Sequence, residues 1–183
     1  MIHYPKSDRR TDALADLGFA LDHQGQTRRA IQRYTEWLRD YPKGPQKKKI
    51  SLRLARLYRR ANNFGQEAGI YLQWIQGNPA DSLELQLPLA DTYYRLKNYQ
   101  KAAHFYQAAL KGKETSAETD WMQFQLAKCY NALGQREQGK KMLDQLAQST
   151  KDPLMKQLAA ATGQSLTSRG SRGVSDGIGR KKG

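Results

Sequence analysis

Residues 54–79, LARLYRRANNFGQEAGIYLQWIQGNP, contain two apolar stripes on either side of a turn. Leu54 and Tyr58 belong to the first stripe, and Tyr71 and Trp74 belong to the second. Apolar residues three and four positions apart indicate an amphipathic helix, and the paired asparagines at 62–63 indicate a turn. The stretch therefore predicts two antiparallel helices.

The same hairpin recurs along the chain. Equivalent apolar positions are separated by 37, 35 and 37 residues, and they are Leu21, Tyr58, Tyr93 and Tyr130. This spacing is a repeat of about 34 residues with short insertions, the length of a helical-hairpin repeat. The predicted helix pairs are 12–24 with 27–40, 46–61 with 64–77, 82–96 with 99–112, and 116–133 with 136–149. Pro153 opens a ninth helix, because proline suits the first turn.

Small and large residues alternate at equivalent places in these hairpins. Small residues are expected to let paired helices approach closely, and they are Gly18, Ala55, Ala90 and Ala127. Large aromatic residues are expected to fill the space between neighbouring hairpins, and they include Tyr34, Tyr71 and Tyr106. Because one hairpin buries too little apolar surface to be stable alone, stability should come from contacts between neighbours.

The pattern resembles the tetratricopeptide repeat family over about residues 11–153. The first copy has the Leu17-Gly18 start, the small residue Ala30, the aromatic Tyr34 and the closing Pro42. The resemblance implies an all-α right-handed superhelix of four antiparallel helix hairpins with a C-terminal capping helix. It also implies a concave groove lined by the first helix of each pair. Three positions depart from the family pattern: Glu67 and Gly139 stand where a small alanine is usual, and Glu114 replaces the closing proline.

These features predict the following domain organisation. A flexible N-terminus covers residues 1–10, and one repeat domain covers 11–166. Its repeats lie at about 11–44, 48–81, 83–116 and 120–153, followed by a cap at 153–166. The remaining residues, 167–183, have five glycines and five basic residues and are expected to form a disordered basic tail.

A basic face is the main candidate for a binding site. The chain has 31 Lys and Arg against 17 Asp and Glu, for a net charge of +14, and residues 43–60 contain eight basic residues and no acid. Four of them are spaced to share one face of a helix, and they are Lys49, Arg53, Arg56 and Arg60. This face is either kept for solubility or binds an acidic segment of a partner, since arginine suits carboxylate recognition.

The other first helices carry further groove candidates. The first unit has Asp12 and Asp16 on the matching face. The third unit contributes Asp91, Tyr94 and Arg95, and the fourth contributes Lys128 together with Trp121 and Phe124. Trp121 and Phe124 are expected to pack against the cap or the preceding hairpin, as aromatics at helical spacing usually belong to the core.

Enzymatic chemistry has no support in the sequence. The three histidines lie far apart, no pair of His or Cys has the spacing of zinc ligands, and no cofactor motif is present. Cys129 is expected to be a small core residue. No stretch has the length and apolarity of a membrane helix. As given, the chain is expected to be cytoplasmic, or periplasmic or membrane-associated if it belongs to a longer protein.

The predicted function is a non-catalytic scaffold or adaptor that binds a peptide or helix of another protein in its groove, of the kind found in bacterial repeat proteins. The alternative is a helical repeat associated with nucleic acid, which would use the same basic face and the Arg-Gly pairs of the tail. That alternative predicts binding that weakens steeply with salt. Self-association is a further option that the sequence leaves open.

Overall fold

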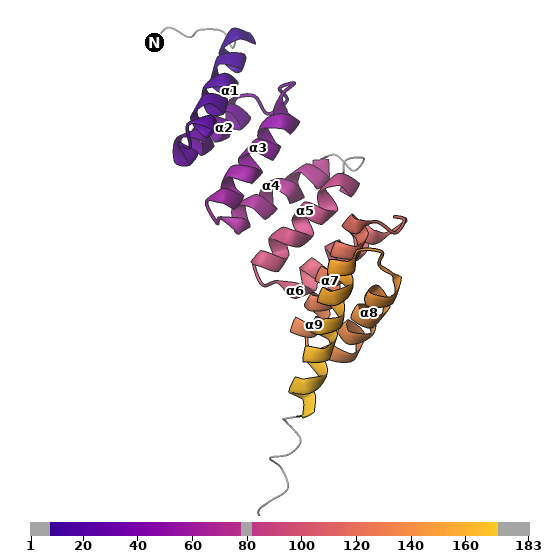
Figure 1. Cartoon of the computed structure of the whole chain (residues 1–183). Helices are drawn as coiled ribbons and strands as arrows, with labels where there is room; N and C mark the ends of the chain where they lie inside the picture. Colours follow the sequence, from indigo (N-terminus) through magenta and orange to yellow (C-terminus); the bar gives the residue numbers. More distant parts are fainter. Residues whose placement is uncertain (1–7, 78–81, 172–183) are drawn as a thin grey trace, which may run out of the picture. The chain divides into compact units, whose positions relative to one another are not determined.

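The computed structural model describes residues 8–77 and 82–171. These ranges contain nine α-helices and no strand (Figure 1). The helices are α1 (Asp8–His23), α2 (Thr27–Asp40), α3 (Lys47–Arg60), α4 (Phe64–Gly77), α5 (Ser82–Arg95), α6 (Tyr99–Leu110), α7 (Ala117–Ala132), α8 (Arg136–Ser149) and α9 (Pro153–Ser171). The all-α hairpin architecture is therefore confirmed, whereas the right-handed superhelix stays a prediction.

The helix ends agree with the predicted hairpins at most positions. Each of the four predicted turns contains one residue with a positive φ angle, and these are Gly25 (71°), Asn62 (55°), Lys97 (57°) and Gly134 (81°). A left-handed residue ends an α-helix, and glycine and asparagine adopt that conformation most readily. Turn chemistry in the sequence was thus sufficient to locate the hairpin tips.

The two ends of the predicted domain differ from the structure. Helix α1 begins at Asp8, three residues before the predicted start at 11, and α9 continues to Ser171 instead of ending at 166. No proline follows Pro153, so no proline ends α9 at the predicted boundary. The rest of the predicted flexible N-terminus and of the predicted tail lies outside the described residues.

The chain divides into two compact units, and the division falls between Leu85 and Gln86 within α5. Helix α5 also contains Pro88, which cannot donate the backbone hydrogen bond expected in a helix interior. One repeat domain had been predicted over 11–166.

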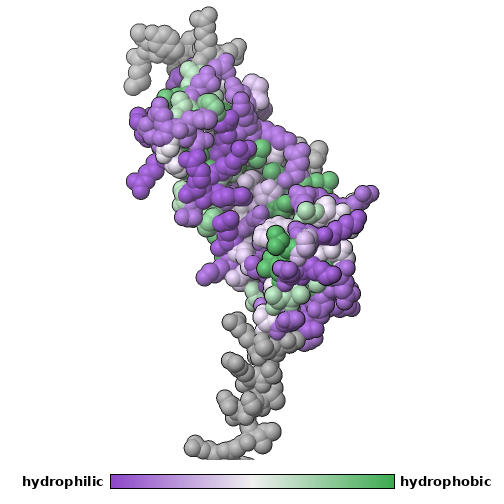
Figure 2. Space-filling model, viewed as in Figure 1, coloured by the Kyte–Doolittle hydropathy of each residue, from purple (hydrophilic) through white to green (hydrophobic). Residues whose placement is uncertain are grey.

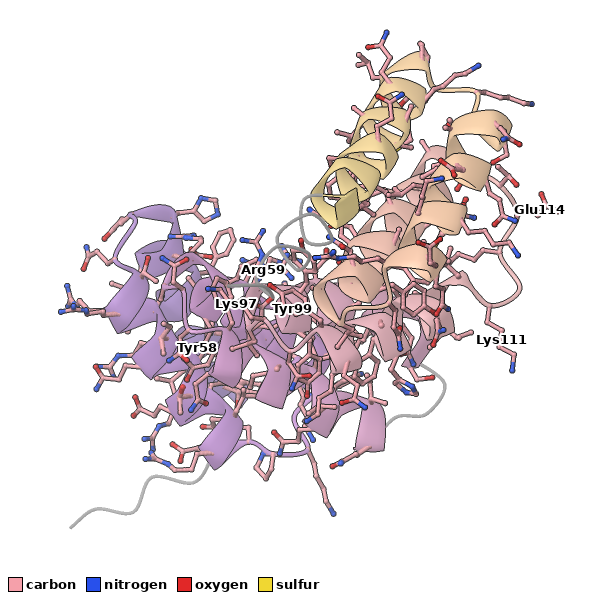
Figure 3. All side chains as sticks on the ribbon, turned by 90° about the horizontal axis from the view of Figure 1, so that it is seen from below. Tyr58, Arg59, Lys97, Tyr99, Lys111 and Glu114 are labelled. Carbon is pink, nitrogen blue, oxygen red and sulfur yellow. The ribbon has the colours of Figure 1, made fainter. Side chains whose placement is uncertain are left out.

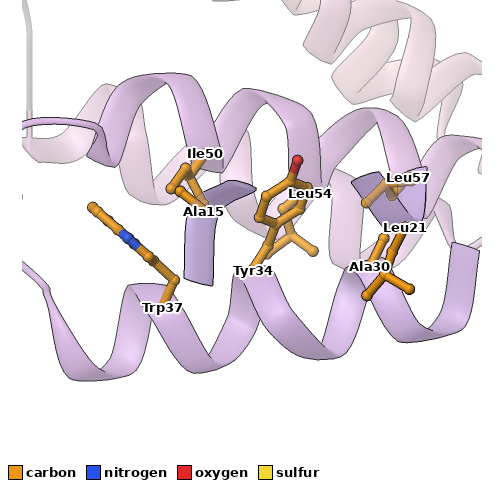
Figure 4. Close-up of a cluster of buried hydrophobic side chains, with 8 residues drawn as sticks. All are labelled: Ala15, Leu21, Ala30, Tyr34, Trp37, Ile50, Leu54 and Leu57. Carbon is orange, nitrogen blue, oxygen red and sulfur yellow. The ribbon is translucent and has the colours of Figure 1, made fainter. Parts of the chain in front are cut away.

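In the first unit, consecutive helices pack in the order α1, α2, α3 and α4. Eight buried residues from α1, α2 and α3 form its core (Figure 4): Ala15, Leu21, Ala30, Tyr34, Trp37, Ile50, Leu54 and Leu57. Trp37 is fully buried, and its Nε1 donates to the backbone oxygen of Thr11 at 2.9 Å. This bond fixes α2 against the beginning of α1.

In the second unit, α6, α7, α8 and α9 pack in sequence, and α9 also contacts α7. Phe124 is 4% exposed and belongs to a core cluster with Ala159 of α9, so its predicted packing against the cap is confirmed. The same prediction was wrong for Trp121, which is 41% exposed although its ring lies 6.0 Å from that of Phe124. The view in Figure 2 shows a mainly hydrophilic surface with small apolar patches.

Gly18 makes room for the ring of Tyr34 between α1 and α2. A Cβ atom at Gly18 would lie 2.5 Å from Cε1 of Tyr34. We expect Gly18→Ala to lower the free energy of unfolding by about 2 kcal/mol, because overpacking forces a buried ring to shift. Urea denaturation monitored by circular dichroism measures this loss.

Gly69→Ala is the matched control for that substitution. Gly69 lies inside α4, is exposed, and has no atom within 4 Å of a built Cβ. The control should therefore stabilise the chain, by up to about 1 kcal/mol. Equal effects of the two substitutions would contradict a close contact at Gly18.

Candidate partner-binding site

A cavity of about 160 Å³ opens between α1 and α3 in the first unit. Its polar, charged and aromatic lining comes from Asp16, Phe19, Tyr34, Gln46, Lys49 and Arg53, and we call it the α1–α3 pocket. It lies between the first helices of the first two hairpins, where the family resemblance places the groove. Two of the predicted site residues, Lys49 and Arg53, therefore lie together in a cavity.

The basic side of the pocket is arranged by α3. Lys49 and Arg53 are four residues apart and point the same way from the helix. The guanidinium carbon of Arg53 lies 4.5 Å from the centroid of the Phe19 ring, a cation–π distance. This contact holds the guanidinium at the pocket. Among the described residues, neither Lys49 nor Arg53 forms an ion pair.

Tyr34 contributes a buried hydroxyl to the same pocket. Its side chain is only 1% exposed, and within the described part of the chain its hydroxyl has no acceptor for its proton. Figure 4 shows the ring within the core cluster and the hydroxyl pointing away from α2. Burial raises the pKa of Tyr34 above its ordinary value, and the charge of Arg53 together with a hydrogen-bond interaction between the two side chains opposes that rise. The phenol is therefore protonated at neutral pH and can donate a hydrogen bond.

The other two residues of the predicted basic face are placed differently. Arg60 Nη1 lies 2.5 Å from the carboxylate of Asp22, and Arg60 Nη2 donates to Thr27 Oγ1 at 3.1 Å. Arg60 thus connects the end of α3 to the α1–α2 turn. Arg56 is exposed on α3 and is not among the residues that line the pocket.

Asp91, a predicted groove residue of the third hairpin, bonds to a buried tyrosine. The hydroxyl of Tyr106 donates to Asp91 Oδ1 at 2.5 Å. Tyr106 is fully buried, and burial together with this hydrogen bond raises its pKa above the ordinary value of 10.0. Asp91 therefore has a structural contact that its spacing in the sequence did not reveal.

Lys128 and Tyr94 lie together in the second unit. Lys128 Nζ is 4.9 Å from the ring centroid of Tyr94 and 5.5 Å from that of Phe124. A second cavity of about 270 Å³ is lined by Tyr94, Tyr99, Lys128, Asn131, Arg136 and Thr162, among others; Tyr99 is labelled in Figure 3. Arg95 is exposed and is not part of this lining.

The described residues offer little for catalysis. They contain no group of three or more His, Cys, Asp or Glu side chains that could hold a metal ion. Cys129 is fully buried, and burial raises its pKa to about 12. Because the thiolate is the nucleophile, this cysteine is a poor one at neutral pH. None of the helices in ranges 8–77 and 82–171 is both long and apolar enough to span a membrane.

Comparisons with known proteins agree with the repeat architecture. Residues 96–162 match the model of the tetratricopeptide repeat family. Over these residues the chain is similar to tetratricopeptide repeats. A search of curated proteins finds no match.

Solved structures show the same fold at low sequence identity. TPR-like repeats of a Podosopora anserina kinesin light chain align with 92% of each chain at 17% identity and a TM-score of 0.68. A tetratricopeptide repeat protein from Parabacteroides merdae aligns with 88% of this chain and 61% of its own at 15% identity and a TM-score of 0.71. MamA from Desulfovibrio magneticus aligns with 93% of this chain and 100% of its own at 11% identity and a TM-score of 0.63.

The repeat fold supports a general role in protein interaction. Stacked helix hairpins create extended surfaces that such proteins use for binding. The pocket adds a place on that surface where charged, aromatic and hydrogen-bonding groups converge. The sequence identified three of its residues as groove candidates, Asp16, Lys49 and Arg53, but gave no reason to select Phe19, Tyr34 or Gln46.

Proposed function

We propose that this chain is a non-catalytic scaffold that binds an acidic segment of a partner protein at the α1–α3 pocket. The observation that carries the proposal is the pair of cations, Lys49 and Arg53, which line one cavity and have no ion-pair partner in residues 8–77 and 82–171; Arg53 also lies over the Phe19 ring. A carboxylate on the partner would neutralise these two cations, and the Phe19 ring would contact an adjacent apolar group.

Most other basic residues of α3 differ from Lys49 and Arg53 because they already pair with acids of the same chain. Three of them already face acids: Lys48 pairs with Glu84 at 3.4 Å, Arg59 with Glu67 at 2.6 Å, and Arg60 with Asp22. The basic face is thus partly neutralised by the protein itself. A nucleic-acid surface would use the whole stripe for phosphates, whereas part of this stripe is already paired with acids and two of its other cations, Lys49 and Arg53, converge on one cavity.

Asp16 lines the same pocket and limits what can enter it. Its carboxylate would repel a run of consecutive acids, since like charges disfavour one another at short range. A partner with one acidic residue next to hydrogen-bond donors or a basic residue fits the lining better. We therefore expect selectivity for a particular segment over polyanions in general.

The test is affinity capture from a native lysate of the source organism at low and high salt. The wild-type chain is compared with the double variant Lys49→Glu/Arg53→Glu. We expect a protein partner that the wild type retains at high salt and the double variant loses. Lys43→Glu/Arg56→Glu is the matched control, since both of its exposed basic residues lie outside the pocket lining and the charge change is the same.

Two results would contradict the proposal. Equal loss of the partner in the control would show that general positive charge, and not the pocket, causes binding. Capture of nucleic acid alone, disappearing at high salt, would favour the phosphate-binding alternative.

A further inference from the structure

Helix α9 has an apolar face that points to solvent. Leu154 is 74% exposed and Leu158 is 43% exposed. Ala161 and Ser165 are also exposed, and they continue the same line along the helix at intervals of four, three and four residues. Residues at these intervals share one face of a helix. We call these four residues the α9 seam.

A different face of α9 covers the rest of the second unit. Helix α9 is the last helix of this unit and packs on α8 and α7 (Figure 1). Ala159 is fully buried in the core cluster, and Met155 and Leu166 pack against that cluster. Each of these three residues follows a seam residue directly in the sequence, and consecutive residues of an α-helix point about 100° apart. The seam is therefore left uncovered by residues 8–77 and 82–171.

The seam differs in chemistry from the surface expected on a terminal helix. A helix that only caps a repeat array needs a polar outer face to remain soluble. Residues 157–168 contain no Lys, Arg, Asp, Glu or His, although the whole chain has a net charge of +14. Exposed leucines on an uncharged stretch of an otherwise hydrophilic surface indicate a contact site.

Side-chain size along the seam favours contact with a second copy of the same face. The large residues Leu154 and Leu158 come first, and the small residues Ala161 and Ser165 follow. If two α9 helices lie antiparallel about a two-fold axis midway between residues 159 and 160, Leu158 faces Ala161 and Leu154 faces Ser165. Each leucine then fits beside a small residue, as knobs fit into holes. Parallel packing would instead place leucine on leucine.

Charge favours the same arrangement. Two chains that each carry a net charge of +14 repel one another, and this repulsion is weakest where the contacting surfaces are uncharged. Antiparallel packing also keeps the Lys156 side chains of the two copies apart, whereas parallel packing would place them side by side. The helix dipoles agree, since the positive end of each α9 would lie beside the negative end of the other.

We infer that the α9 seam binds a second copy of this chain in an antiparallel α9–α9 pair with two-fold symmetry. The same face is used on both copies, so the contact closes a dimer and does not continue into a filament. A single pair of helices buries less surface than a standard stable interface, and we expect a dissociation constant of about 10 to 100 µM. This inference goes beyond the proposed function, whose site lies on α1 and α3 of the first unit.

Sedimentation equilibrium of the full chain tests the inference. The average mass should rise from that of a monomer to that of a dimer between about 1 µM and about 1 mM protein, because association follows mass action. Higher salt should strengthen the dimer severalfold, since salt screens the repulsion between two basic chains. A contact made of ion pairs would respond in the opposite direction.

Leu158→Glu is the deciding variant, because it places two like charges close together at the centre of the pair. We expect it to weaken the dimer by at least about tenfold. Leu17→Glu is the matched control: Leu17 is 45% exposed on α1, so the same change is made at an equally exposed leucine. This control should leave the dissociation constant unchanged. Circular dichroism checks that both variants keep their helix content.

Cysteine cross-linking tests the antiparallel register. Leu158→Cys and Ala161→Cys are made separately in a Cys129→Ala background, so that each chain has a single thiol. The two proteins are mixed in equal amounts and oxidised. Cross-links between the two different variants should exceed those within either one, because residue 158 faces residue 161 of the other copy.

Three results would overturn the inference. The chain could stay monomeric up to about 1 mM, which would leave the seam to a helix of another protein. The dimer could persist in Leu158→Glu, or be lost equally in Leu17→Glu. Cross-links could favour identical positions, which would indicate parallel packing. None of these results affects the capture of a partner through Lys49 and Arg53, so the two proposals fail separately.

Discussion

Arg59→Met is expected to lower the free energy of unfolding by about 3 kcal/mol, the cost of leaving a buried charge without its partner. Glu67 is fully buried on α4, and Arg59 Nε lies 2.6 Å from its Oε1. Figure 3 shows Arg59 next to Tyr58 on α3. Methionine keeps much of the side-chain length but leaves the Glu67 carboxylate uncompensated. Urea denaturation followed by circular dichroism measures the change.

The two partners should respond unequally to substitution. Glu67→Gln removes the negative charge at nearly constant volume, and the side chain of Arg59 is 35% exposed, so water can solvate its charge. Glu67→Gln should therefore cost well under half as much as Arg59→Met. The double variant should recover most of the loss. A double variant as unstable as Arg59→Met alone would show that the loss comes from packing and not from charge.

This ion pair also explains a departure of the sequence from the repeat pattern that it resembles. Glu67 occupies the position where the equivalent residues are small, and Ala30, Ala102 and Gly139 are all buried there. An acid at such a position is tolerated because the preceding helix supplies an arginine eight residues earlier. The sequence identified Glu67 as a departure from the repeat pattern, but did not identify its partner.

Local signals in the sequence predicted the helices, since periodic apolar residues and turn residues act over a few positions. They could not predict contacts such as Arg60 with Asp22, which lie 38 residues apart. Spacing places side chains on a helix face, whereas their partners depend on how neighbouring helices pack. Arg60 and Lys49 looked equivalent for this reason, although one connects helices and the other lines a pocket.

The alignment of the repeats contains one indication of the pocket. Alignment of the repeats places Phe19 opposite Tyr34 where Asp91 stands opposite Tyr106. The sequence alone shows that the first repeat keeps the tyrosine and lacks the acid. It does not show that this difference marks a pocket, because only the packing shows that the Tyr34 hydroxyl is buried and that Tyr34 lines a cavity.

Stability is expected to fall steeply between pH 9 and pH 12. Burial raises the pKa of Cys129 from 9.0 to about 12. In that window the folded chain keeps the thiol proton while the unfolded chain has lost it, so the folded state binds one more proton. Stability then decreases as pH rises, by about 1.4 kcal/mol per pH unit for one such group.

Buried tyrosines should steepen this decline above pH 10. Burial raises the pKa of Tyr34, Tyr71 and Tyr106 above the ordinary value of 10.0, so their unfolded forms also release protons first. Below pH 9 none of these groups contributes a slope, because both states are protonated. The measurement is the free energy of unfolding from urea titrations at intervals of pH.

Cys129→Ala isolates the contribution of the thiol. The variant keeps the three tyrosines but has no thiol, so the folded and unfolded states no longer differ by the thiol proton. Its free energy of unfolding should therefore decline less steeply than that of the wild type between pH 9 and pH 10. In this range the thiol is the first of these groups to titrate in the unfolded chain. Equal slopes in the two proteins would mean that the thiol of Cys129 ionises as readily in the folded chain as in the unfolded one. Such a thiol would have to reach solvent through α7, which contradicts its complete burial.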